Sequence, residues 1–445
     1  MRGANQAPSR IPWGFAEFFI ISQTALPALL FLPGTQVFRL PIRTAAFAIS
    51  LLAFAWWILE SPRDVRQSRV QSWVGAVMAL LAIMVFHPLT PSLLGGVAQM
   101  GLYLAVMAPL FWAPVLVRTP EHLARILWIL LICSGCNALV GVLQVYDSRW
   151  LPAEFSRILS SNEGAMGPVT FIGADGQRLV RPPGLFDTPG AVAGPAMSAA
   201  FLGLVFAIST SLPSWRRALA FAFAIAGLAA IYLSQVRISL VMTLLMMIVY
   251  TVVCLRQGRA ARASQFGILA ASILFGGFLI ALTIGGPAIR ERVMTLLGSD
   301  PIGVYQTARG TQLSLTFNEM LFEHPLGAGL GRWGMAAVYF GSFTHLSTPL
   351  WAEIQFTGWM ADGGILMIAL YCSALAVTAL TQWRVATSTR YPRLTASAGV
   401  VFAANLGTAA LIFSFVPFVT QIGIQYWFLA GALHGVSSAH GVEGA

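Results

Sequence analysis

Arginine side chains are the residues of this chain whose chemistry and positions are most informative. All 26 basic residues are Arg, and the sequence contains no Lys. A guanidinium group is planar, permanently charged and forked, so it suits bidentate binding of phosphate oxygens. The lack of Lys excludes a Walker A phosphate loop and a Lys Schiff base, since both need the amine. A GC-rich genome also explains a bias toward Arg, so the functional interpretation depends on where the arginines lie.

Three segments place a basic side chain close to a predicted helix start. The segment Arg181–Pro189 ends in Asp-Thr-Pro, in which Asp or Thr suits the N-cap and Pro the first helical position. The segment His345–Glu353 repeats this pattern, with Thr348 as the expected cap and Pro349 as the first helical residue. Between them, Ser234–Arg237 predicts a minimal turn before another apolar helix.

Such helix starts favour anions. Helix N-termini carry unpaired N–H groups and roughly half a positive charge, and added guanidinium groups make phosphate the usual guest. Each basic residue also has a structural explanation. Arg237 suits snorkelling to lipid headgroups, Arg181 suits bonds to backbone carbonyls, and His345 suits an ordinary loop histidine.

The composition of the chain indicates which kind of fold holds these residues in place. The chain is 57% hydrophobic and 9% charged with a mean hydropathy of +0.76, whereas a soluble domain is roughly 25% charged. We therefore expect an all-α polytopic membrane protein, a single transmembrane domain over residues 1–445 without a cleaved signal. With about 20 apolar residues per span, we predict about twelve spans. They centre near residues 24, 51, 80, 106, 135, 199, 225, 247, 275, 368, 405 and 428.

Two long polar segments interrupt the spans, at about 147–186 and about 286–348. The positive-inside rule is met when both termini are cytoplasmic. The inner segments then hold Arg2, Arg10, Arg63, Arg66, Arg69, Arg118, Arg125, Arg216, Arg217, Arg256, Arg259, Arg262, Arg384, Arg390 and Arg393. Among short outer loops, only the one with Arg39 and Arg43 is basic. Both long segments would therefore lie outside the cytoplasm, where chemistry has no ATP or nucleotide sugar and needs an already activated, membrane-borne substrate.

Other partners and cofactors are not indicated. The net charge of +10 is spread over many short loops, which fits orientation in the membrane better than nucleic-acid binding. Cys133 and Cys136 have CxxC spacing inside an apolar run, without a nearby His or second Cys pair. We expect no metal and no cofactor.

Several segments in combination resemble the O-antigen ligase and polymerase superfamily of bacterial membrane glycosyltransferases. The resemblance covers about residues 178–380. It rests on Arg181-x-x-Gly-x-Phe-x-x-Pro, on Ser-Gln-Val-Arg237, on Arg309 followed by Glu-His324-Pro-Leu-Gly-Ala-Gly, and on Thr-His345 before a Glu-bearing helix. The family often has Asn after this His, whereas Leu346 follows here, and residues 351–364 are not typical of lipid A ligases. These departures favour an exopolysaccharide polymerase-like member.

The resemblance implies a fold, a substrate and a location. It implies a large helical extracytoplasmic loop between about the ninth and tenth spans of a bacterial inner-membrane protein. It further implies metal-independent transfer or polymerisation of glycan from an undecaprenyl-diphosphate-linked donor on the periplasmic face. The expected partners are that donor, membrane lipids, a glycan or lipid acceptor and other polysaccharide-assembly proteins.

Site residues follow from the resemblance together with their chemistry. Arg181, Arg237 and Arg309 would stabilise the charge that grows on the leaving diphosphate. His345 would act as general base on the acceptor hydroxyl or as another phosphate ligand, and Glu353 would orient it or act as base. Secondary candidates are His324, Asp362 and Arg332. Glu353 and Asp362 also suit polar contacts between helices.

A multi-span secondary transporter or flippase for a lipid-linked or anionic solute is the alternative. Such proteins have polar residues near the midplane, helices broken by Gly or Pro and two related halves. Here the two halves differ, since both long segments fall in the middle and later part of the chain. A non-catalytic assembly scaffold is a third option. The sequence favours the transferase.

Overall fold

A computed structural model describes residues 13–32, 34–60, 68–151, 170–172, 176, 178–297, 303, 305–343, 348–388 and 392–441. Over these residues the chain is almost entirely helical, which confirms the all-α class. The α-helices are α1 Phe15–Ala28, α2 Arg39–Glu60, α3 Arg69–Met84, α4 Leu93–Met107, α5 Pro109–Leu116, α6 Pro120–Tyr146, α8 Ala193–Ala207, α9 Ser214–Ser234, α10 Arg237–Arg256, α11 Ala260–Leu297, α13 Thr311–Leu315, α14 Leu321–Glu323, α15 Gly334–Phe340, α16 Gln355–Thr387, α17 Pro392–Ala410 and α18 Gln421–Ala439.

The other regular elements are short. Two strands, β1 Thr170–Ile172 and β2 Arg178–Val180, form an antiparallel pair in the first long polar segment, where the sequence predicts no sheet. Two π-helical stretches, Gln306–Gly310 and Thr316–Met320, flank α13. The 3-10 turns are Leu29–Phe31, Thr35–Phe38, Ser148–Trp150, Leu411–Phe413 and Pro417–Val419.

Length and hydropathy indicate a membrane protein of many spans. Within the part of the chain that the structure describes, eight helical segments are long and apolar enough to cross a bilayer. They are Arg39–Glu60, Leu93–Leu116, Pro120–Tyr146, Ser214–Ser234, Arg237–Arg256, Ala260–Leu279, Gln355–Thr387 and Pro392–Phe413. Shorter apolar helices cover Phe15–Phe31, Arg69–Met84 and Ala193–Ala207.

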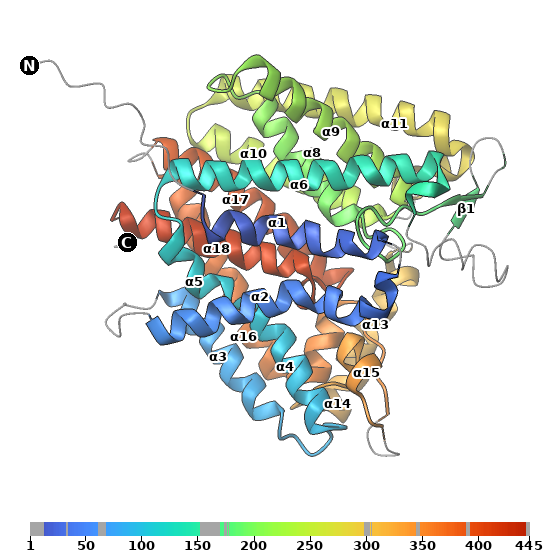
Figure 1. The fold of residues 1–445 in the computed structure, drawn as a ribbon, viewed down its shortest axis with the longest axis vertical. Coiled ribbons are helices and arrows are strands. Elements are labelled where there is room, and N and C mark those ends of the chain that lie inside the picture. Colours follow the sequence, from blue (N-terminus) through green and yellow to red (C-terminus); the bar gives the residue numbers. More distant parts are fainter. Residues whose placement is uncertain are drawn as a thin grey trace, which may run out of the picture.

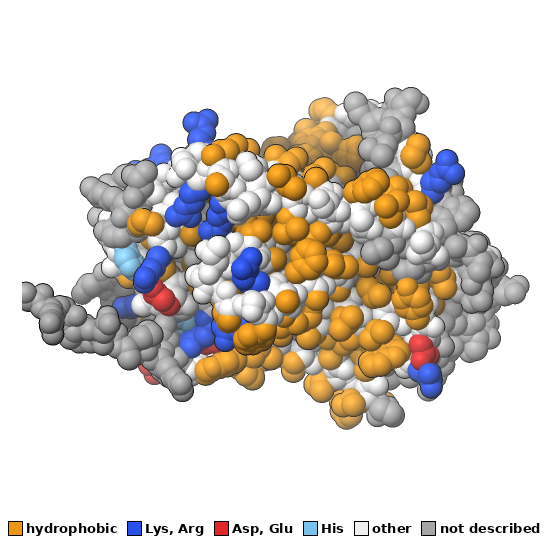
Figure 2. Space-filling view, turned by 90° about the horizontal axis from the view of Figure 1, so that it is seen from above, with side chains coloured by type: hydrophobic (Ala, Val, Ile, Leu, Met, Phe, Trp, Pro, Cys, Tyr) orange, Lys and Arg blue, Asp and Glu red, His pale blue; other side chains and the backbone are white. Residues whose placement is uncertain are grey.

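The long helices run side by side, so that the molecule has two ends. Figure 1 shows α18 ending at one end, and β1 together with α13 and α15 at the other. Figure 2 shows a largely hydrophobic middle, with basic side chains gathered toward the end at which α18 terminates. The two long polar segments thus contribute their described elements to the same end of the bundle.

Small residues allow the helices to approach closely. A Cβ added to Gly203 of α8 would lie 2.6 Å from the Ala220 carbonyl oxygen, and one added to Gly227 of α9 would lie 2.6 Å from the Ala200 nitrogen. Association in lipid depends on such close packing, because lipid tails are as apolar as the helices. This close packing fixes the position of α8 relative to α9. It thereby also positions the segments that precede α8 and follow α9.

Helix α16 is broken two turns after its start. Gly363 and Gly364 have non-helical dihedral angles, and Gly364 has a φ of 64°. The break leaves backbone groups that a neighbouring turn satisfies: the Ala328 N–H donates to the Ala361 carbonyl at 2.7 Å, and the Ile365 N–H donates to the Pro325 carbonyl at 3.0 Å. The turn after α14 is therefore part of the helix packing.

Two predicted helix starts are wrong. Helix α8 begins at Ala193, not Pro189, and α16 begins at Gln355, not Pro349, so Glu353 precedes its helix. In each case the side-chain oxygens that would cap the helix accept hydrogen bonds from arginines elsewhere in the chain. The Asp187 carboxylate binds two arginines of α2, and the Thr348 hydroxyl accepts from Arg332 Nη2 at 3.3 Å. The predicted start of α10 at Arg237 is confirmed.

Candidate functional site

Arg181 lies against the turn between α9 and α10. Its Nε donates to the Ser234 carbonyl oxygen at 3.0 Å. A Cβ added to Gly190 would lie 3.1 Å from Arg181 Nη2, 3.3 Å from a Val236 methyl group and 3.5 Å from the Ser234 carbonyl oxygen. Gly190 therefore leaves the space in which the guanidinium meets the turn. The structural explanation for Arg181, a bond to a backbone carbonyl, is present in this contact.

The turn itself is tightly built. Gln235 is in the left-handed conformation with a φ of 56°, the one described non-glycine residue with positive φ. The buried Ser234 hydroxyl donates to the Ile231 carbonyl at 2.8 Å and accepts from the Val236 N–H at 3.3 Å. Helix α10 then begins at Arg237. Arg181 thus contacts the turn at which Arg237, 56 positions later in the sequence, begins its helix.

A second cluster of arginines lies beside the start of α8. Arg43 binds the Asp187 carboxylate in a bidentate manner, with Nε–Oδ2 and Nη2–Oδ1 distances of 2.8 and 2.7 Å. Arg39 Nε donates to the same carboxylate at 2.8 Å. Sequence reasoning noted these two arginines only as a basic outer loop. Their spacing of four residues, which places both on one helix face, was the available signal.

Arg309 and Glu353 form an ion pair. The guanidinium Nη1 contacts Glu353 Oε2, and both side chains are about one-third exposed, at 38% and 31%. The Trp351 indole N–H donates to the other carboxylate oxygen, Oε1, at 3.0 Å. The structure therefore brings together a predicted phosphate ligand and a predicted catalytic carboxylate, which in this state neutralise each other.

Arg332 is buried in the large polar segment, 3% exposed. Its Nε and Nη2 donate to the Thr348 carbonyl at 2.9 and 2.8 Å, and Nη1 donates to the Ala328 carbonyl at 3.3 Å. The Leu350 N–H in turn donates to the Arg332 carbonyl at 2.8 Å. These bonds give Arg332 a structural role, in tying together the two parts of the segment that flank residues 344–347.

His324 ends α14, as its Glu-His-Pro context predicts. Its N–H donates to the Met320 carbonyl at 2.7 Å. Close by is His87, after α3, which sequence reasoning missed. Partial burial and repulsion from the neighbouring basic groups His324 and Arg332 lower the pKa of His87. His87 belongs to the α3–α4 connection, on which the turn after α14 packs through Gly329.

Asp362 is fully buried beside the break in α16. Its Oδ2 accepts from the Tyr103 hydroxyl at 2.8 Å and from Gln99 Nε2 at 3.2 Å. The Trp333 side chain interacts with the same carboxyl group, although neither its Nε1 nor Asp362 Oδ1 completes a hydrogen bond among the described residues. The predicted polar contact between helices is present, and it joins α4, α16 and the large polar segment.

His345, the predicted general base, lies outside the described residues, together with Thr344, Leu346 and Ser347. The segment is flanked by described residues on both sides: Phe343 follows α15, and Thr348 accepts from Arg332. Of the predicted site residues, Arg181 contacts the turn before Arg237, Arg309 contacts Glu353, and His324 and Arg332 both influence His87.

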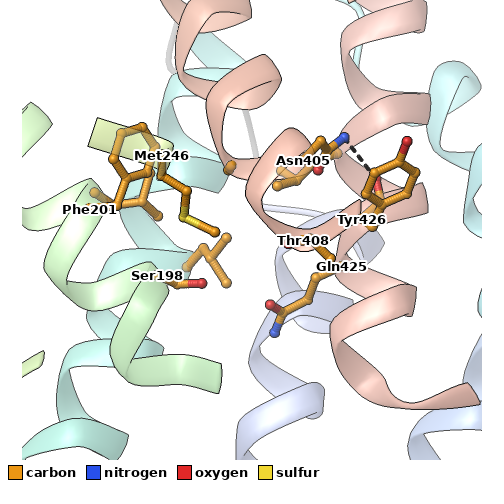
Figure 3. A pocket seen from close by; sticks show the side chains of 11 residues that line it. Ser198, Phe201, Met246, Asn405, Thr408, Gln425 and Tyr426 are labelled. Carbon is orange, nitrogen blue, oxygen red and sulfur yellow. Dashed lines mark hydrogen bonds between the residues drawn. The ribbon is translucent and has the colours of Figure 1, made fainter. Parts of the chain in front are cut away.

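A small cavity lies within the bundle between α8, α10, α17 and α18. It measures about 20 Å³, which is room for about one water. In Figure 3 Ser198 of α8 and Gln425 of α18 face each other across it, with Asn405 and Thr408 of α17 beside them. Asn405 Nδ2 donates to the Tyr426 carbonyl at 3.2 Å. The cavity has a mixed, mainly apolar lining and is too small for a sugar.

Comparison with known proteins gives no family: no family model matches the chain, and no curated protein matches it. Among the residues that the structure describes, no group of three or more His, Cys, Asp or Glu side chains could hold a metal ion. The functional interpretation therefore rests on the chain's own residues.

Proposed function

We propose that this protein is a membrane glycosyltransferase that transfers or polymerises glycan from an undecaprenyl-diphosphate-linked donor on the periplasmic face of a bacterial inner membrane. One observation supports this above the others. Arg181, from the end of the first long polar segment, lies against the turn at which Arg237 begins α10. A guanidinium group beside a helix N-terminus that itself begins with an arginine suits the binding of a diphosphate.

The proposed topology has twelve spans with both termini in the cytoplasm. The eight long helical segments, the three shorter apolar helices and α18 would each cross once. Their positions match the predicted span centres. The gathering of basic side chains toward one end of the molecule supports the orientation, since cytoplasmic loops carry excess Arg.

In the proposed mechanism, the sugar leaves a diphosphate on which negative charge grows in the transition state. Arg181 and Arg237 would stabilise that charge, with Arg309 as a further ligand. Losing one such preorganised donor typically costs about 3–4 kcal/mol of barrier, or 10²–10³ in rate. His345 would act as general base on the acceptor hydroxyl or as another phosphate ligand, and Glu353 would assist it.

The test replaces each arginine by lysine. Arg181→Lys and Arg237→Lys should each reduce growth of lipid-linked glycan in vesicles by at least about 10²-fold, because one ammonium cannot replace a bidentate fork. Arg393→Lys is the matched control, since Arg393 lies at the opposite end and is 87% exposed. Normal polymer output from both test variants would refute the proposal.

The structure also gives the alternative, a secondary transporter or flippase, a specific observation in its favour. Transporters bind substrate or ions at helices broken near polar residues, and α16 breaks beside the buried Asp362. The two functions separate in one preparation of sealed vesicles. Net growth of lipid-linked glycan identifies the transferase, whereas counterflow of a labelled solute without glycan growth identifies the transporter.

A further inference from the structure

The ion pairs at the outer end differ in how readily an incoming anion could replace the carboxylate. Asp187 is only 8% exposed and holds Arg43 in a bidentate contact. The Arg309–Glu353 pair is instead more open to solvent, since both side chains are about one-third exposed. Exposed pairs contribute little stability, whereas charge-assisted bonds from arginine to phosphate are among the stronger ones.

Arg309 is held in place independently of Glu353. At one end of its segment the Tyr305 hydroxyl donates to the Phe413 carbonyl at 2.8 Å. At the other, the Thr316 and Thr357 hydroxyls bond to each other at 2.7 Å, which ties the segment to α16. Arg309 lies in the π-helical stretch between these anchors, and such stretches are frequent at functional sites. The backbone that carries Arg309 would therefore stay in place if the carboxylate partner left.

Glu353 is also held by a second contact. The bond from the Trp351 indole to Oε1 does not involve Arg309. A carboxylate that lost the arginine would remain beside Trp351, charged and able to accept a hydrogen bond. The pair can thus open while the Glu353 carboxylate and the backbone that carries Arg309 keep their positions.

We propose that Glu353 is an exchangeable counter-ion, which occupies Arg309 in the resting state and is displaced from it by the diphosphate of the donor. This rests on the proposed function and adds an order of events to it. The Glu353 carboxylate becomes available to the acceptor hydroxyl only once the donor is bound. A site without donor keeps both groups neutralised.

The experiment measures binding, not turnover, with farnesyl diphosphate as a short polyprenyl diphosphate probe and purified full-length protein in nanodiscs. Glu353→Gln removes the competing charge and should bind the probe about 5–10-fold more tightly than the wild type. Arg309→Gln should bind it at least about tenfold more weakly. The double variant should match Arg309→Gln, because the gain from Glu353→Gln acts through Arg309.

Unchanged or weaker binding by Glu353→Gln overturns the exchange, as does a gain that persists in the double variant. If Glu353→Gln does not fold, Glu353→Asp takes its place: the shorter carboxylate loosens the pair, and a smaller gain in affinity is expected. Arg181→Lys separates the two proposals. Probe binding that depends on Arg181 but not on Glu353 removes only the exchange, whereas a wild type that binds no probe removes the proposed function itself.

Discussion

At the scale of single residues, tertiary partners decide what each charged side chain does. The sequence predicts Asp187 as a helix cap, yet its carboxylate accepts hydrogen bonds from Arg43 and Arg39. The sequence makes Arg332 a candidate for substrate binding, yet it is buried and donates its hydrogen bonds to backbone carbonyls. A guanidinium buried this deeply has exchanged water for fixed acceptors, which favours structure over ligand binding. The partly exposed Arg309 is the better candidate for binding phosphate.

The clearest prediction at this scale concerns Asp362. Its Oδ2 accepts from both the Tyr103 hydroxyl and the Gln99 amide. Asp362→Asn keeps the shape but places an N–H or a neutral oxygen against those donors, so we expect a loss of about 2–3 kcal/mol of unfolding free energy. Tyr103→Phe removes one donor and should cost less, about 1 kcal/mol.

Unfolding of the purified variants in mixed micelles with rising SDS measures both changes. A double-mutant cycle should then give a coupling energy of the same order as the single losses, because the two residues are in direct contact. An Asp362→Asn variant as stable as the wild type would contradict the role of this carboxylate in joining α4 and α16.

At the scale of elements, the apolar runs predict where helices lie but not where they begin. Periodicity and length locate the spans because a membrane helix is apolar over most of its surface. Helix starts depend on side chains far away in sequence, as Arg332 and Thr348 illustrate for α16. The break at Gly363 and Gly364 depends likewise on a turn that begins 38 positions earlier, at Pro325. Adjacent glycines alone did not predict it.

That break gives a prediction with a matched control. A Cβ at Gly364 would lie 2.1 Å from the Pro325 carbonyl oxygen, at a φ of 64° that side chains rarely adopt. We expect Gly364→Ala to cost at least about 2 kcal/mol of unfolding free energy. Gly101→Ala in α4 meets no atom within 4 Å and should be neutral or stabilising by up to about 1 kcal/mol.

The same SDS titration measures the unfolding free energy of both alanine variants. Equal stabilities for the two would mean that the turn after α14 does not dock into α16 in the membrane. Loss of stability in Gly364→Ala alone would support the view that the large polar segment is packed into the bundle at this point.

At the scale of the whole molecule, the sequence predicts best which segments lie at the same end of the helix bundle. Charge asymmetry between loops predicts that the two long polar segments share a side, and their described elements do lie at one end. The site could be predicted only in part. Helix-start patterns pointed to Arg181 and Arg237, although the start predicted after Arg181 is wrong, whereas the Arg309–Glu353 pair joins residues 44 positions apart that no local pattern relates.

Orientation across the membrane decides which reactions this molecule can perform, because a lipid-linked donor and ATP are available on opposite sides. In a background with the four cysteines replaced, Ser342→Cys after α15 should react with a membrane-impermeant maleimide in spheroplasts. Ser211→Cys, between α8 and α9, should react only after permeabilisation. Both serines are exposed, so access to reagent and not burial sets the outcome. The reverse labelling pattern would place the turn between α9 and α10 in the cytoplasm, where nucleotides would compete for its arginines. A periplasmic transferase would then be impossible.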